Sequence, residues 1–128
     1  EPSMRPLIFT CLTLSTVGCS SQHAVDRQLN EAYSRYEAGD CGGAMLALSQ
    51  AERRTRGRGE VQPEISLLRG QCLERQGLYV DAAQTYRFIR MRYPASEYAY
   101  RAAARLETLR QLGHYEPAEP AISHPARP

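Results

Sequence analysis

Four cysteines and three histidines are the residues of this chain best suited to metal binding or covalent chemistry. Cys41 and Cys72 have neither a histidine nor another cysteine near them at the spacing that zinc sites require. His23, His114 and His124 lie in polar segments near the two ends of the expected fold, away from any other ligand type. The sequence therefore predicts no metal site.

Cys41 and Cys72 form an even pair that is available for a different chemistry. In an oxidising compartment such a pair favours one disulfide, here closing about 31 residues. The alternative is a pair of buried free thiols that pack as small apolar side chains. Both readings stay open at the level of the sequence.

Patterns of catalytic residues are lacking. The carboxylates are scattered, and Gly57 and Gly59 flank Arg58 without the Lys-Ser/Thr that completes a phosphate-binding loop. The 128 residues carry a net charge of +2, from 16 arginines against 14 acidic residues, which gives no global field for nucleic acid. We expect no enzyme activity, no cofactor, no nucleic acid and no small-molecule substrate.

One cluster of charge stands out, and it consists of Arg53, Arg54, Arg56 and Arg58. Guanidinium groups bind phosphate oxygens in a bidentate manner, so this cluster suits the phosphates of an anionic lipid or lipopolysaccharide. The alternative is a solvated loop with no ligand.

Helices must position all of these residues. From residue 25 to residue 112 the apolar residues recur at intervals of three and four, and no stretch alternates like a strand. The pattern predicts an all-α fold of five helices, at about 24–38, 41–54, 63–76, 79–93 and 96–112. Gly39, Gly77 and Gly113 end three of them, Pro63 suits a helix start and Ser96 suits an N-cap.

The first two helix pairs form an internal repeat. The segment 39–44 aligns with 77–82 at an offset of 38, which places Ala44 on Ala82 and Ala32 on Gly70. Small residues at these positions allow helix axes to approach to roughly 8 Å. The remaining core volume is assigned to Leu48, Tyr86, Ile89 and Leu106.

This pattern resembles the tetratricopeptide repeat, a helix-turn-helix unit of 34 residues. Ala82, Tyr86 and Pro94 match the family's alanine, bulky residue and proline, although the first copy lacks the proline. The resemblance implies a helical hairpin stack over residues 25–112, with about two repeats and a C-terminal capping helix. Residues 83–99 further resemble periplasmic repeat proteins, such as the assembly lipoprotein of the outer-membrane β-barrel machinery and the coordinator of Tol–Pal.

In that family the first helix of each pair lines a groove that accepts a peptide or helix of a partner. The resemblance implies that ten residues line it here. They are Leu29, Tyr33, Tyr36, Glu37, Leu67, Gln71, Glu74, Arg75, Arg101 and Arg105.

The N-terminal segment reads as an export signal. Arg5 precedes an uncharged, mostly apolar run over 7–17, which is long enough for a signal peptide. Gly18 and Cys19 then resemble the lipobox of bacterial lipoproteins. This resemblance implies that residues 1–18 are removed, that Cys19 is acylated, that residues 19–24 form the lipidated start and tether, and that the anchor holds the protein on the periplasmic face of the outer membrane. The alternative is a soluble periplasmic protein.

The C-terminal segment 113–128 is rich in proline and poor in apolar residues, which predicts a disordered tail or a short docking peptide. Together these features predict a lipoprotein that acts as a non-catalytic adaptor for another envelope protein. The alternatives are a self-associating or complex-assembly subunit and an activator of a peptidoglycan enzyme.

Overall fold

The computed structural model describes residues 17–55 and 59–117, without the side chains of 17–20, and these residues form five α-helices and no strands. The helices are α1 (Val17–Glu37), α2 (Cys41–Arg54), α3 (Gln62–Arg75), α4 (Tyr79–Arg92) and α5 (Glu97–Gln111). The all-α prediction is confirmed. The helix ends agree with the predicted ones within about a residue, except at the start of α1.

Helix α1 begins at Val17, well before the predicted start near Ala24. Residues 20–24, the predicted tether, are therefore helical in the structure. The stretch has no glycine or proline between Cys19 and Val25 to stop a helix. Val25 is buried, and it anchors this part of α1 against the other helices.

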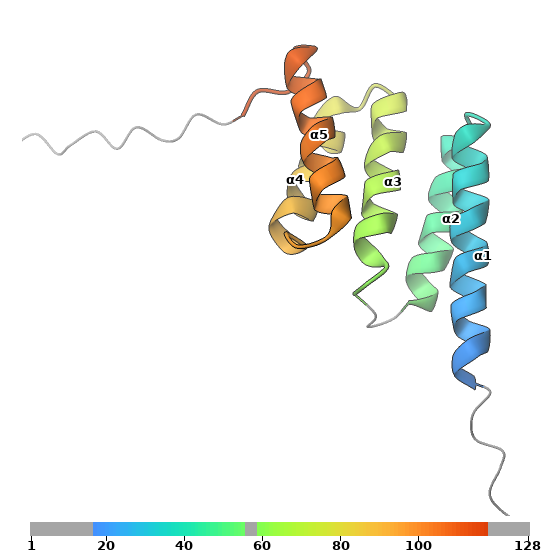
Figure 1. The fold of residues 1–128 in the computed structure, drawn as a ribbon. Helices are drawn as coiled ribbons and strands as arrows, with labels where there is room; N and C mark the ends of the chain where they lie inside the picture. The colour runs from blue at the N-terminus through green and yellow to red at the C-terminus, as the bar shows by residue number, and fades with distance from the viewer. Residues whose placement is uncertain (1–16, 56–58, 118–128) are drawn as a thin grey trace, which may run out of the picture.

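The helices form two layers (Figure 1). Each helix packs on the next one along the chain, and α3 also contacts both α1 and α5. The odd-numbered helices α1, α3 and α5 consequently lie side by side in one layer, with α2 and α4 behind them. This arrangement is a stack of helical hairpins closed by a fifth helix.

The three odd-numbered helices end in the same way. Gly39, Gly77 and Gly113 each have a φ between 76° and 81°, a conformation that glycine adopts without steric cost. At each end, the glycine N–H and the next N–H donate to carbonyls in the last turn of the helix, as in the Schellman motif. Asp40 and Leu78, which follow the first two glycines, have nearly equal φ and ψ angles. The repeat seen in the sequence is thus also a repeat of backbone conformation.

Small residues lie where the helices pack most closely. Ala32, Ala44 and Ala82 are fully buried, and a Cβ added to Gly70 would lie 2.6 Å from Cε1 of Tyr86. The side chains predicted to fill the core, Leu48, Tyr86, Ile89 and Leu106, are at most 4% exposed. The core therefore depends on glycine and alanine positions that bring helix backbones together.

Candidate interaction surface

The odd-numbered helices form one continuous surface, which we call the odd-helix face. Three contacts between helices define it. Tyr33 of α1 donates a hydrogen bond of 2.9 Å to Oε1 of Glu64 on α3. Burial and the Glu64 carboxylate raise the pKa of Tyr33, and burial and the same carboxylate raise the pKa of Tyr98 on α5 to about 12. Side chains from all three odd-numbered helices therefore meet around Glu64.

A second set of contacts lies nearer the C-terminal ends of α1 and α3. The Arg75 guanidinium of α3 stacks 3.6 Å from the centre of the Tyr36 ring and donates to the Tyr36 carbonyl oxygen. Arg105 of α5 forms a two-point ion pair with Glu74 of α3, at 3.2 and 2.5 Å. The Glu74 side chain is only 12% exposed, so this pair fixes α5 against α3.

Of the ten residues predicted to line a groove, most lie on this face, but two predictions are wrong. Leu29 and Leu67 are buried in the apolar clusters between helices, so their side chains cannot contact a partner. Leu29 lies four residues before Tyr33, and Leu67 lies four residues before Gln71, so each leucine shares a helix face with a half-buried residue but is itself covered by apolar side chains of neighbouring helices. Gln71 is half-buried, whereas Glu37 and Arg101 are exposed.

The sequence analysis missed Glu64 and Tyr98. Glu64 lies in the first turn of α3, and Tyr98 lies in the first turn of α5. Glu64 and Tyr98 are 34 residues apart, which is the length of one tetratricopeptide repeat. Aligning the capping helix with α3 at that offset would have pointed to both residues as equivalent positions.

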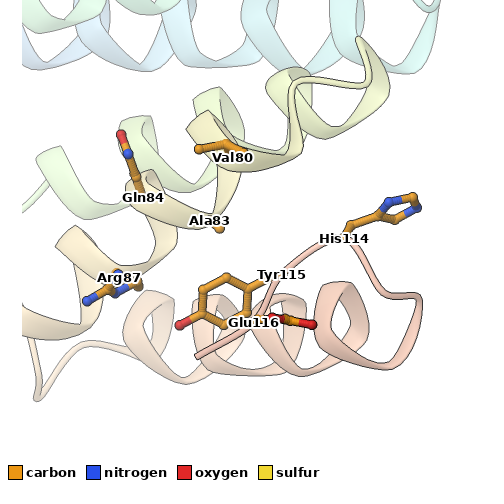
Figure 2. A pocket seen from close by; sticks show the side chains of 7 residues that line it. All are labelled: Val80, Ala83, Gln84, Arg87, His114, Tyr115 and Glu116. Carbon is orange, nitrogen blue, oxygen red and sulfur yellow. The ribbon is translucent and has the colours of Figure 1, made fainter. Parts of the chain in front are cut away.

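A hollow of about 240 Å³ lies on a different side, between α4 and the segment that follows α5. Val80, Gln84 and Arg87 line it from α4, while His114, Tyr115 and Glu116 line it from that segment (Figure 2). The predicted disordered tail therefore needs correction at its start. Tyr115 packs against the core and His114 stacks on Tyr79 at 3.8 Å, whereas 118–128 lie outside the described residues.

Cys41 and Cys72 are brought together, and both are free thiols in the structure. They are buried in one small cluster with Ala44, at the contact of α2 with α3. Burial and the adjacent Cys41 thiol raise the pKa of Cys72 to about 12, which keeps Cys72 protonated at neutral pH. The structure therefore corresponds to the free-thiol alternative.

The arginine cluster is only partly described. Arg53 and Arg54 are exposed in the last turn of α2, while Arg56 and Arg58 lie outside the described residues. In the described part of the chain, no group of three or more His, Cys, Asp or Glu side chains could hold a metal ion. None of its helices has both the length and the apolar character needed to cross a bilayer.

Comparison with known proteins identifies no relatives. No protein-family model matches the chain, and no curated protein or solved structure is significantly similar to it.

Proposed function

We propose that this protein is an envelope lipoprotein that serves as a non-catalytic adaptor, with the odd-helix face as its binding surface. The observation that carries the proposal is the joining of α1, α3 and α5 by the Tyr33–Glu64 hydrogen bond and the Glu74–Arg105 ion pair, which makes one polar and aromatic surface from three helices. Tyrosine and arginine are the residue types that contribute most to protein interfaces. Tyr36 and Arg75 supply both types in one stacked pair.

The face is organised before a partner arrives. Tyr33, Tyr36 and Glu74 are held by contacts between helices, so a partner does not have to order them on binding. Preorganised side chains lose less conformational entropy on association, which favours affinity. Glu37 remains exposed beside them and is available for an ion pair with a partner, whereas Arg101 is exposed and pairs with Glu97 at 3.7 Å.

Site-resolved photo-crosslinking in the native envelope tests the adaptor function. A photoreactive amino acid is placed at Glu37 or Arg101 on the odd-helix face, and at Gln84 on α4 as the control. We expect both positions on the face to yield an adduct of the same partner and Gln84 to yield none. Adducts of equal yield from all three positions, or only from Gln84, contradict the proposal.

The lipid anchor has its own test. Small residues ending in Gly18 directly before Cys19 support acylation at that cysteine. We expect mass spectrometry of the native protein to find an acylated N-terminal Cys19, and Cys19→Ser to move the protein from the membrane fraction to the soluble fraction. An unmodified Cys19 in membrane-bound protein contradicts the anchor.

Self-association is a second candidate, and one observation favours it. Helix α5 ends the stack among the described residues, and its Tyr100 is 81% exposed. Sedimentation velocity of the wild type and of Tyr100→Ser compares the two functions. A monomer at every concentration contradicts self-association, whereas a wild-type dimer lost in Tyr100→Ser supports it.

A further inference from the structure

Four arginines lie at one end of the helix stack. Arg53 and Arg54 belong to the last turn of α2, and Arg90 and Arg92 belong to the last turn of α4. Because α2 and α4 run in the same direction, their C-terminal ends lie at the same end of the stack (Figure 1). We call these four residues, with the neighbouring Phe88 and Met91, the basic edge.

The arginines of the basic edge have no acidic partner among the described residues, and the same holds for Arg27, Arg75 and Arg87. Arg92 only approaches the Tyr93 ring at 5.2 Å. The nearest carboxylate on α2, Glu52, is taken by Arg69. The guanidinium groups of the edge are therefore available to an external anion.

Carboxylates at the same end of the stack lie in the first turns of α3 and α5, whereas the first turn of α1 has no acidic residue. Glu64 is engaged by Tyr33, and Glu97 is paired with Arg101 at 3.7 Å. Glu60 is exposed near the start of α3. The negative charge thus lies with α3 and α5, and the unpaired positive charge lies with α2 and α4.

Exposed apolar side chains accompany the arginines on α4. Met91 is 78% exposed and Phe88 is 49% exposed, and Phe88 meets the Tyr93 ring edge-on. A favourable interaction with the helix dipole explains arginines in a last turn, but it does not explain large apolar residues left in water beside them. Arginine next to exposed aromatic and aliphatic groups is the combination that binds at a lipid headgroup region, where the apolar groups enter and the cations meet phosphate.

We propose that the basic edge rests on an anionic phospholipid surface. The positions of α1 and Cys19 give the orientation, because α1 extends past the end of α2 on this side (Figure 1) and Cys19 lies in that extension. This orientation rests on the proposed anchor, whereas the charge and the exposed apolar groups do not. The edge adds a second contact with lipid that does not depend on acylation.

Vesicle binding tests the edge in the full chain carrying Cys19→Ser, which cannot be acylated there. One variant replaces Arg53, Arg90 and Arg92 with glutamine. The matched control replaces three exposed arginines outside the basic edge and has the same net charge. These are Arg27, Arg35 and Arg110.

Binding is measured by flotation with vesicles of phosphatidylglycerol and phosphatidylcholine, and with phosphatidylcholine alone. Each arginine near an anionic surface contributes about fivefold to affinity, so we expect the edge variant to bind at least tenfold more weakly and the control to stay within about twofold of the parent. Circular dichroism at the same temperature shows that each variant is folded.

Three outcomes overturn the proposal. Equal losses in both variants show that only net charge matters, and equal binding to the two vesicle types shows that the anionic lipid is not recognised. Binding of the edge to polyglutamate without binding to vesicles assigns it to an acidic protein instead. None of these outcomes bears on the odd-helix face, whose crosslinking test contains no vesicles.

Discussion

Replacing Gly70 with alanine tests the packing on which the helix stack depends. The added Cβ would lie 2.6 Å from Cε1, 3.0 Å from Cζ and 3.1 Å from Cδ1 of Tyr86. Carbon atoms in ordinary contact are about 3.5–4.0 Å apart, so the ring and the α3 backbone must separate by about 1 Å. Tyr86 is fully buried, and its ring cannot turn out into solvent.

Two opposing effects set the size of the change. Overpacking of a core costs about 1–3 kcal/mol, and alanine in place of glycine within a helix gains up to about 1 kcal/mol. We expect Gly70→Ala to lower the free energy of unfolding by about 1–2 kcal/mol. In a domain of this size that corresponds to a fall of roughly 5–10 °C in the melting temperature.

Gly42→Ala is the matched control, because Gly42 is also helical. The nearest atom to its added Cβ is Oδ1 of Asp40 at 3.7 Å, which is an ordinary contact. We expect this variant to be as stable as the wild type or more stable by up to about 1 kcal/mol. Thermal unfolding followed by circular dichroism measures both. A Gly70→Ala protein at least as stable as the wild type would refute the reasoning about close packing of α3 on α4.

Three further perturbations concern polar groups in and beside the core. The Tyr86 hydroxyl is buried close to the charges of Glu74 and Arg105 but forms no hydrogen bond in the described part of the chain, so in urea titration Tyr86→Phe should leave the free energy of unfolding unchanged or raise it by up to about 1 kcal/mol. Oxidised glutathione should join Cys41 to Cys72 by thiol–disulfide exchange. The bond should stabilise the wild type by about 3 kcal/mol, whereas the same treatment should leave the stability of Cys72→Ala unchanged. A wild-type protein that loses its free thiols but keeps its unfolding midpoint contradicts this prediction. The Arg69 guanidinium lowers the pKa of Glu52 below 4.5. The ionised Glu52 therefore contributes to the free energy of unfolding above pH 4.5, and this stabilisation is lost as the pH falls through the lowered pKa. The melting temperature should therefore fall more steeply with acidification in the wild type than in Glu52→Gln.

Helix number, helix ends and the small-residue positions could be read from the sequence because each depends on local or periodic features. Gly39 and Gly77 end their helices through their own backbone freedom, and Ser96 caps α5 by accepting from the Ala99 N–H. Ala44 and Ala82 could be aligned because the repeat keeps them at one offset. Such features need no knowledge of how distant side chains meet.

The surface was harder to predict, since its residues are defined by contacts between helices. The family pattern places Leu29 and Leu67 in the groove on the correct helix face, but neighbouring helices cover both side chains, and that packing cannot be read from the spacing along one helix. Glu64 was overlooked because nothing near it in the chain marks it, and its partner Tyr33 is 31 positions away. Arg53 and Arg54 stand out in the sequence, but their grouping with Arg90 and Arg92 does not, since α2 and α4 bring these arginines to one end only after folding.

The two proposed surfaces use different parts of the fold, and this separation yields a last prediction. The odd-helix face is made of side chains from α1, α3 and α5, whereas the basic edge is made of the C-terminal ends of α2 and α4. A protein partner and a lipid surface can then be bound together. Neutralising Arg53, Arg90 and Arg92 should accordingly leave the yield of the adduct from position 101 unchanged in detergent-solubilised envelopes, where no bilayer concentrates the protein.

If that yield falls with the edge variant in detergent, the two surfaces are coupled and the partner contacts both. The stack would then bind one large partner around its end, and the membrane would play no part in the edge. If the yield is unchanged in detergent but falls in intact envelopes, the edge acts by orienting the odd-helix face toward partners that are themselves held at the membrane. That second result is the one expected if the proposed anchor at the start of α1 and the unpaired arginines at the same end of the stack both meet the membrane.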